Sequence, residues 1–136
     1  MVEELNEYCA NTLNTSLGIE FNEVSKESVV ATMPVDERTI QPMGILNGGA
    51  SMALVEIIAS AGANLLINRE TQVGYGLEIN GNHVKPAFQG ETVKGVGSAI
   101  HVGNTTQVWE VKIFNQKEEL VNISRMTIAV RPRPKG

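Results

Sequence analysis

The feature that most constrains this chain is a twenty-residue apolar stretch, GGASMALVEIIASAGANLLI, which runs from Gly48 to Ile67. Its length matches the ~20 residues of a membrane-spanning helix. However, Glu56 stands in its middle, Gly and Ala are abundant, and the chain holds no second stretch of this kind. Because a helix that is apolar on nearly every side can be buried inside a soluble protein, we expect a core helix over 48–68 and no membrane span.

Length and composition predict one soluble domain and argue against a nucleic-acid partner. The 136 residues suit a single domain, and 42% hydrophobic against 19% charged residues is enough to build a core. The chain has one Trp, two Tyr and three Phe, and 11 Lys+Arg against 15 Asp+Glu give a net charge of −4. A nucleic-acid-binding module needs exposed aromatic rings and a basic surface, which this composition does not favour.

Cysteine content and the N-terminus predict a cytoplasmic protein. Cys9 is the only cysteine, so an intrachain disulfide cannot form, and we interpret it as a small buried hydrophobic residue. The N-terminus, MVEEL, is acidic. It lacks the basic region and apolar run of a signal peptide.

The residues on either side of the long helix predict one short helix and six strands. Apolar residues recur at helical spacing over 2–13. Alternating residues bounded by turn residues indicate strands at 18–24, 28–35, 72–85, 91–102, 105–114 and 119–130. Within the third strand, the alternation places Val73, Tyr75, Leu77 and Ile79 on one face.

These elements predict an α+β fold in which a curved antiparallel sheet wraps the long helix. A helix that is apolar on nearly every side needs a sheet that curls around it. Residues 36–49 carry Pro42 and three glycines, so they form a loop. We assign 1–130 to the single domain and expect the basic, proline-rich tail 131–136 to be loose.

Glu56 is the one charged residue within the apolar helix. Ser60 and Asn64 follow it at i+4 and i+8, so the three form a narrow polar stripe. Burial of an ionised carboxylate is costly unless it is paired or hydrogen-bonded. Glu56 is therefore either a structural carboxylate at a subunit contact or a catalytic nucleophile or general base. Ser60 either orients it or bonds back to a helix carbonyl.

The segment QPMGILNGGAS, residues 41–51, leads into this helix. Asn47 is a candidate N-cap, and glycine pairs at such a position commonly serve packing or capping. The same geometry leaves backbone N–H groups free at the positive end of the helix dipole. Those groups could bind a developing oxyanion.

Taken together, these motifs resemble those of the hotdog-fold acyl-CoA thioesterases. The matching features are the segment 41–51, Glu56 nine residues after Asn47, GLEINGNHV at 76–84 and HVGNTTQVW at 101–109. The resemblance covers about residues 31–130 and is strongest at 41–60 and 76–84. The most similar branch comprises the phenylacetate-pathway (PaaI-like) type and the 1,4-dihydroxy-2-naphthoyl-CoA hydrolases of menaquinone synthesis.

The resemblance implies a hotdog fold whose active sites lie at the interface of a homodimer, with dimers often paired into homotetramers. It implies hydrolysis of the thioester of an aromatic or medium-chain acyl-CoA to the free acid and CoA, without a cofactor. Glu56 would attack the thioester or activate a water, with Ser60 beside it. The Gly48 N–H of the other protomer, supported by Gln41, would polarise the carbonyl. The residues expected to border CoA and the acyl group are Gly76, His83, Val84, Lys85, Pro86, His101, Val102, Gly103, Asn104, Thr105 and Thr106.

Asn47 departs from the pattern of this branch, whose members carry His before the glycine pair. A neutral Asn amide can donate a hydrogen bond, but it cannot become cationic or transfer a proton. The chain is therefore either an active thioesterase or a non-catalytic or weakly active acyl-CoA-binding dimer. A hotdog dehydratase is less favoured, because the sequence lacks the His-plus-carboxylate pattern that those enzymes resemble. Only His83 and His101 supply imidazoles, and no metal site or P-loop is expected.

Overall fold

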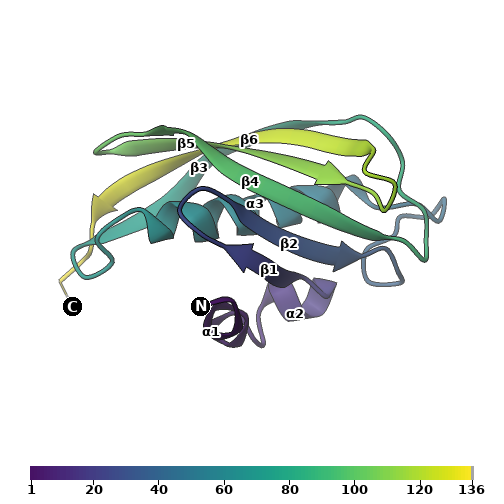
Figure 1. Cartoon of the computed structure of the whole chain (residues 1–136), viewed down its shortest axis with the longest axis horizontal. Helices are drawn as coiled ribbons and strands as arrows, with labels where there is room; N and C mark the ends of the chain where they lie inside the picture. Colours follow the sequence, from purple (N-terminus) through teal and green to yellow (C-terminus); the bar gives the residue numbers. More distant parts are fainter. Residues whose placement is uncertain (136) are drawn as a thin grey trace.

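A six-stranded antiparallel sheet packs against one long helix in the computed structural model, which describes residues 1–135 (Figure 1). The helix, α3, spans Gly48–Leu65. The strands are β1 (Glu20–Val24), β2 (Val29–Pro34), β3 (Gln72–His83), β4 (Thr92–Val102), β5 (Thr106–Phe114) and β6 (Leu120–Pro132). Their order in the sheet is β1-β2-β4-β5-β6-β3, so β1 and β3 form its edges. The predicted α+β architecture is confirmed.

The face of α3 that packs on the sheet carries the apolar side chains of the core. Its buried residues are Ala50, Ser51, Leu54, Val55, Ile58, Ala59, Gly62 and Ala63. Among residues 1–135, α3 is the one helix whose length and hydropathy would suit a membrane span. Its buried face makes it the core helix of the domain.

Trp109 of β5 packs against α3 where the helix has no side chain. A Cβ atom at Gly62 would lie 2.3 Å from the Trp109 ring, so only glycine allows this contact. The Trp109 indole donates to Gln107 Oε1 (2.8 Å), and Gln107 Nε2 donates to the Ala63 carbonyl (3.2 Å). The buried polar atoms of this pair are therefore satisfied, and they anchor the C-terminal half of α3 to the sheet.

The N-terminal residues form two short helices, and the single helix predicted over 2–13 is wrong. α1 spans Val2–Tyr8 and α2 spans Leu13–Leu17. Asn11 adopts a left-handed conformation (φ +61°), which ends helical geometry, and Thr12 caps α2. Asn6 of α1 exchanges two hydrogen bonds with the Phe21 backbone, which holds the helix beside β1 (Figure 1).

A β-bulge at Leu77 makes the predicted alternation along β3 wrong. Gly76 pairs with Ile128 and Glu78 with Thr127, so Leu77 is the extra residue. A bulge reverses which side chains face inward beyond it. Tyr75 and Leu77 are exposed, whereas Ile79 packs against the core.

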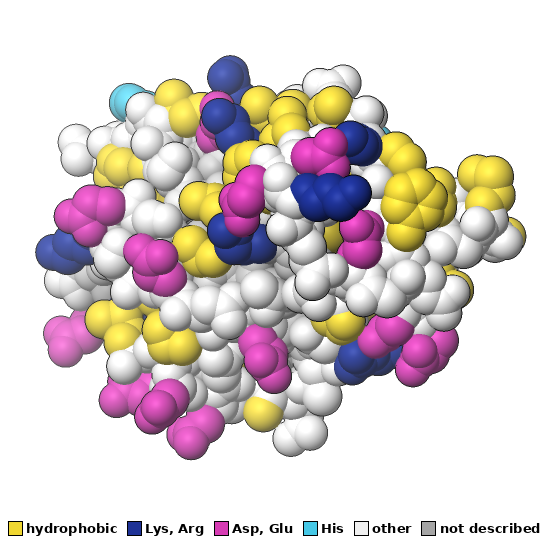
Figure 2. All heavy atoms as spheres, turned by 45° about the vertical axis from the view of Figure 1, so that its right-hand side comes forward, with side chains coloured by type: hydrophobic (Ala, Val, Ile, Leu, Met, Phe, Trp, Pro, Cys, Tyr) yellow, Lys and Arg dark blue, Asp and Glu magenta, His cyan; other side chains and the backbone are white. Residues whose placement is uncertain are grey.

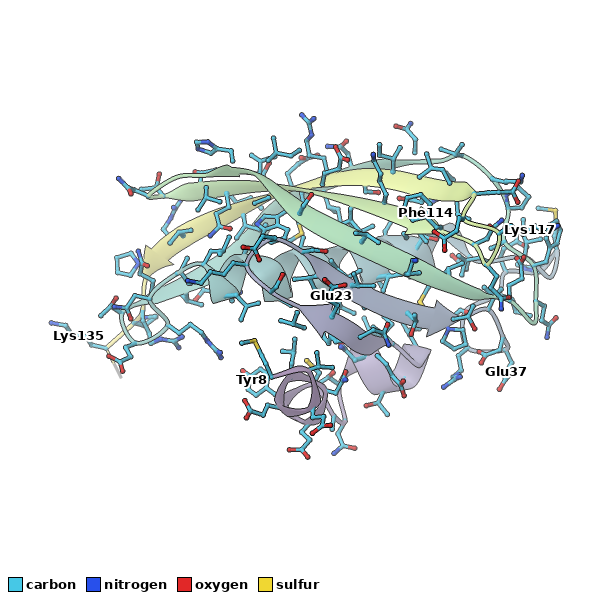
Figure 3. All side chains as sticks on the ribbon, viewed as in Figure 1. Tyr8, Glu23, Glu37, Phe114, Lys117 and Lys135 are labelled. Atoms are coloured by element: carbon cyan, nitrogen blue, oxygen red, sulfur yellow. The ribbon has the colours of Figure 1, made fainter. Side chains whose placement is uncertain are left out.

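β6 extends beyond the predicted end of the domain at residue 130. Arg131 and Pro132 still pair with β3, and the Arg133 N–H donates to the Thr71 carbonyl (2.8 Å). This end of the molecule lies opposite the β5–β6 hairpin, as the positions of Lys135 and Lys117 show (Figure 3). Gly136, the last residue of the predicted tail, lies outside the described residues.

Candidate functional site

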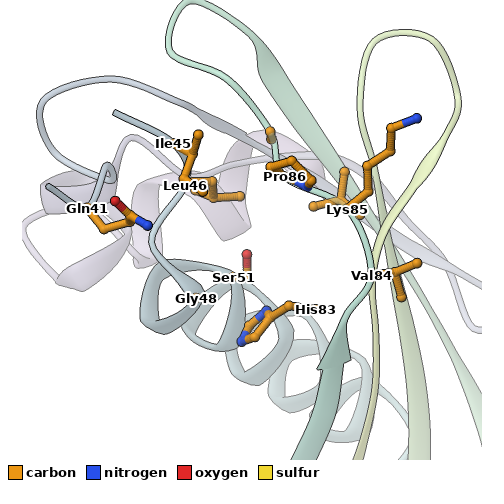
Figure 4. Close-up of a pocket in the computed structure, with 11 residues that line it drawn as sticks. Gln41, Ile45, Leu46, Gly48, Ser51, His83, Val84, Lys85 and Pro86 are labelled. Carbon is orange, nitrogen blue, oxygen red and sulfur yellow. The ribbon is translucent and has the colours of Figure 1, made fainter. Parts of the chain in front are cut away.

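A cavity of about 410 Å³ opens at the N-terminal end of α3 (Figure 4). Its walls come from the loop before α3, the first turn of the helix, the end of β3 with the residues that follow, and the start of β6. Six of the residues predicted for the site line it: Gln41, Gly48, His83, Val84, Lys85 and Pro86. The topology therefore gathers two of the predicted sequence segments around one space.

The first turn of α3 presents one free backbone donor to this cavity. Asn47 is the N-cap, as predicted, and its Oδ1 accepts from the Gly49 N–H (2.8 Å). The N–H groups of Ala50 and Ser51 donate to the Asn47 carbonyl (3.0 and 3.2 Å). Among the hydrogen bonds of residues 1–135, the Gly48 N–H has no acceptor. It lies at the positive end of the helix dipole, where an oxyanion would be stabilised.

His83 lies directly over Gly48. A Cβ atom at position 48 would be 2.6 Å from His83 Nε2, so a larger residue there would displace the imidazole. Figure 4 shows the ring beside the first turn of α3. On the other side of the ring, Nδ1 lies 3.1 Å from the amide nitrogen of Asn122. The ring is thus held between α3 and β6.

Gln41 lies on the cavity wall because the loop before α3 folds into a tight turn. The Gln41 N–H donates to the Ile45 carbonyl (2.9 Å), and Gly44 takes a left-handed conformation (φ +78°) within the turn. The Gln41 side-chain oxygen accepts from the Met43 N–H. Its amide nitrogen points towards the cavity (Figure 4), where it can serve as a second donor.

The segment after His83 turns part of its side chains away from the cavity. Val84 points outward, and the Lys85 side chain extends away from the cavity (Figure 4). The Lys85 ammonium pairs with Glu119. This hydrogen bond from Lys85, supported by one from Asn115, lowers the pKa of Glu119. Pro86 faces the cavity opening. Lys85 thus shapes the cavity through its stem and leaves its charge at the rim.

The surface near the cavity contains exposed apolar side chains and mixed charges. Met43, Val84 and Phe88 each expose more than half of their surface. On the face drawn in Figure 2, acidic and basic side chains are interspersed with hydrophobic ones and form no continuous basic patch. This composition suits an uncharged, apolar part of a ligand better than a strongly anionic macromolecule.

Glu56 lies elsewhere on α3 and is exposed, so its predicted burial is wrong for a single chain. A Cβ atom at Gly76 would be 2.5 Å from Glu56 Oε2, so the carboxylate lies over this glycine of β3. Asn64 continues the predicted polar stripe and donates to the Ser60 carbonyl (2.8 Å). Its Oδ1 accepts from the Gly74 N–H (3.2 Å). The stripe follows β3, and because β3 is an edge strand, no further strand within residues 1–135 covers it.

One chain does not bring the carboxylate and the free N–H together. Gly48 and Glu56 are eight residues apart on the same helix, which separates them by ~12 Å along its axis. The predicted group at 101–106 lies at a third place, in the β4–β5 turn, where the Gly103 N–H donates to the Thr106 carbonyl (2.9 Å). This turn lies near the C-terminal end of α3, because the adjacent Gln107 bonds to Ala63.

Three polar residues near the cavity were missed by the sequence analysis: Ser51, Asn122 and Ser124. Ser51 is buried one turn into α3, with its hydroxyl facing the cavity (Figure 4). Asn122 and Ser124 lie on the inward face of β6, in phase with the core residue Met126. The alternation along β6 could have identified Asn122 and Ser124, because every second residue of a strand faces the same side.

The titratable residues outside the cavity do not suggest a metal site. Among residues 1–135, no three His, Cys, Asp or Glu side chains lie close enough together to hold a metal ion. Cys9 is half-buried beside the N-terminal helices, and burial raises the pKa of its thiol. A protonated thiol is a poor nucleophile.

The chain is similar to thioesterases and esterases over most of its length. The family model described as Thioesterase superfamily matches residues 43–122. ComA2 of Bacillus subtilis (strain 168) is 52% identical over 120 residues, which cover 88% of this chain and 94% of that protein. The 1,4-dihydroxy-2-naphthoyl-CoA hydrolase of Escherichia coli (strain K12) is 43% identical over 129 residues, 95% of this chain and 93% of the hydrolase. The crystal structure of thioesterase HI1161 from Haemophilus influenzae is 39% identical with a TM-score of 0.92, covering 97% of this chain and 91% of the other.

Proposed function

Because the chain belongs to the thioesterase superfamily, we propose that it hydrolyses acyl-CoA thioesters to a free acid and CoA. The chain is thus a thioesterase with the hotdog fold, as the sequence motifs predicted. We further propose an aromatic or medium-chain acyl group, which the apolar residues around the cavity can accommodate. The name of the Escherichia coli relative, which specifies an aromatic naphthoyl thioester, supports the aromatic choice.

The observation that carries this proposal is the free Gly48 N–H in a cavity that also holds the amide of Gln41. Both residues line the same cavity, and donors placed there would stabilise the negative charge that develops on the thioester carbonyl oxygen during attack. Glu56 supplies the second component. It attacks the carbonyl carbon itself or removes a proton from a water that does so. In either route water adds to the acyl group and CoA leaves as the thiol, with Ser60 one turn from the carboxylate to orient it.

A homodimer would complete this site. β3 is twelve residues long, and its outer edge is unpaired within residues 1–135. An unpaired strand edge favours pairing with a strand of another chain. Antiparallel pairing of two β3 strands places the Gly76 half of one beside the His83 half of the other. Glu56 of one protomer, which lies over Gly76, is then carried towards Gly48 of the other. The ~12 Å separation of Gly48 and Glu56 within one chain supports this partnership.

The remaining predicted residues are assigned to the substrate in this dimer. Gly76 leaves room beside Glu56, His83 and Pro86 face the cavity, and Val84 and Lys85 border its mouth. We assign His101, Val102, Gly103, Asn104, Thr105 and Thr106 to contacts with the CoA portion. We also propose that dimers pair into a homotetramer through exposed apolar residues such as Tyr75 and Ile100. The proposed location is the cytoplasm, and the chemistry requires no cofactor.

A substrate screen with a thiol reagent tests the function. Benzoyl-, phenylacetyl-, dihydroxynaphthoyl- and medium-chain acyl-CoAs are each incubated with the protein, and release of CoA is measured. We expect at least one to be hydrolysed, and Glu56→Gln to lower kcat by about 10²-fold or more, as loss of a general base does. Circular dichroism of the variant checks that the fold is intact. A Glu56→Gln protein as active as the original would exclude Glu56 as the catalytic carboxylate.

The second candidate, a non-catalytic acyl-CoA-binding dimer, is favoured by Asn47 alone. Its cap oxygen is committed to the Gly49 N–H, so only its amide N–H groups can face a substrate. This hypothesis predicts that acyl-CoA binds, as calorimetry would measure, but that no CoA is released from any thioester. Turnover of any substrate in the screen decides against it.

A further inference from the structure

A chain of polar contacts leads from two buried side chains of β6 to the exposed imidazole over Gly48. Ser124 Oγ donates to Asn122 Oδ1 (2.6 Å), and Asn122 Nδ2 lies 3.1 Å from His83 Nδ1. Asn122 is fully buried and Ser124 is 3% exposed. Buried polar groups are retained when each one is satisfied, and a fully satisfied network holds its members in one arrangement.

The strand register explains why these side chains meet. His83 pairs with Asn122 and Gly81 with Ser124 across the β3–β6 ladder. The bulge at Leu77 turns Gly81 and His83 to the inner face of the sheet. A Cβ atom at Gly81 would lie 1.9 Å from Ser124 Oγ, so glycine is required there to leave room for the hydroxyl.

The orientation of the Asn122 amide indicates which nitrogen of His83 carries the proton. Because the Asn122 oxygen accepts from Ser124, its amide nitrogen faces His83, and this nitrogen also lies 3.9 Å from Met52 Sδ, a weak acceptor. An amide nitrogen can only donate. With the amide in this orientation, His83 Nδ1 accepts and the proton of the neutral ring lies on Nε2. This is the atom that lies over Gly48.

We infer that Asn122 and Ser124 are positioning residues that hold His83 as the neutral Nε2–H tautomer, aimed at the thioester bound by Gly48. The inference rests on the proposed function for its catalytic meaning. The ring then supplies a third hydrogen-bond donor in a site that already offers the Gly48 N–H and the Gln41 amide.

The groups that face His83 leave this tautomer undisturbed. Gly48 and Met52 of α3 and Asn122 and Ser124 of β6 carry no charge. Lys85 lines the same cavity, and its ammonium is paired with Glu119. In the proposed dimer, Glu56 of the second protomer is the carboxylate brought to the cavity. It can accept from Nε2–H, while Nδ1 remains occupied by the Asn122 amide.

The tautomer can be read directly by ¹⁵N NMR of the two imidazole nitrogens of His83 in the ligand-free protein at neutral pH. We expect a protonated Nε2 and an unprotonated Nδ1. A protonated Nδ1 would overturn the inference. Because this measurement needs no substrate, it is independent of the proposed function: an Nε2–H signature in a protein that releases no CoA would count against the function alone.

Asn122→Asp tests the consequence for catalysis with a near-isosteric change. A carboxylate accepts from Nδ1–H, so the neutral ring carries its proton there and Nε2 loses it. Above neutral pH, kcat/KM is expected to fall by about 10²-fold, the cost of removing one donor from such a site. The activity should recover as the pH falls, because the imidazolium donates from both nitrogens. The original protein should show no such pH-dependent loss on the alkaline side.

Asn82→Asp is the matched control, since this exposed neighbour introduces the same charge from the opposite face of β3. It should leave the pH profile unchanged. A uniform loss of activity at every pH in Asn122→Asp would indicate a structural role only and overturn the inference. If that variant does not fold, Ser124→Ala is used, which frees the amide to rotate. An NMR signature in Ser124→Ala identical to that of the original protein would equally contradict the inference.

Discussion

Asn47 combines two properties at one position. Its side-chain oxygen caps α3, and the two N–H groups of its amide nitrogen remain available near the free Gly48 N–H. The capping oxygen satisfies the Gly49 N–H and so leaves Gly48 as the one uncommitted donor of the first turn. Asn47 therefore stabilises the helix start but cannot carry a positive charge.

A pair of substitutions at Asn47 separates these roles. Asn47→Asp keeps a capping oxygen and should leave the free energy of unfolding nearly unchanged, whereas Asn47→Ala should lower it by about 1 kcal/mol. If the amide N–H groups contact the substrate, both variants should lose activity to a similar degree. Urea denaturation and kcat/KM of the three proteins provide the comparison. Equal stability of the Ala variant would contradict the capping role.

At the level of elements, β3 and the residues that follow it carry most of the site. The bulge at Leu77 places Gly76 under Glu56 and His83 over Gly48; without it, positions 76 and 83 would face opposite sides of the sheet. The segment after His83 is then tied to the start of β6 by the Lys85–Glu119 ion pair. This pair holds one wall of the cavity.

The Lys85–Glu119 pair should make stability depend on pH. The hydrogen bond from Lys85 lowers the pKa of Glu119 in the folded protein. The stabilisation is therefore fully present above the ordinary pKa of a glutamate, ~4.3, and is lost as the pH falls from there through the lowered value. At neutral pH, Glu119→Gln should have a lower free energy of unfolding than the original protein. The two free energies should become equal in acid.

Urea denaturation at a series of pH values measures this difference. Glu27→Gln, which removes an exposed carboxylate in the β1–β2 turn, is the control and should match the original protein throughout. If the free energy of unfolding of Glu119→Gln differed from that of the original protein by the same amount at every pH, the ion pair would not be the cause of the difference.

For the whole molecule, the sheet order decides how the site is assembled. β3 follows α3 in the chain but lies at the far edge of the sheet, beside β6. The stripe containing Glu56 therefore faces the uncovered side of the domain, and the free N–H of Gly48 lies two turns away. Two copies of the chain would complete one site, and each dimer would contain two of them.

Complementation between two inactive chains tests this assembly. Glu56→Gln lacks the carboxylate, and Gly48→Ala displaces His83 from the oxyanion site, so each homodimer should be inactive. A mixed dimer has one site with both original residues, so random co-assembly should restore about a quarter of the original activity. Co-expressed, differently tagged chains and CoA release provide the measurement. Activity no greater than the sum of the separate variants would indicate that each chain carries its own site.

Local pattern was sufficient to predict the long helix, the six strands and the cap at Asn47. Each depends on neighbouring residues: the spacing of apolar side chains, the alternation in the strands, and an Asn before a glycine pair. The bulge at Leu77 could not be predicted, because an extra residue in a strand is defined by its partner on β6. Asn11 ended the first helix early through a single backbone conformation that helical spacing does not reveal.

The sequence by itself determined the α+β architecture, the family motifs and the two chemical components, a carboxylate and a helix N-terminus. These follow from covalent order and from short-range periodicity. Only the tertiary structure decided that Glu56 lies exposed beside an edge strand, that His83 covers Gly48, and that Asn122 and Ser124 stand behind the ring. Such placements depend on which strands pair and in what register, and these long-range pairings arise from the packing of the whole sheet around α3.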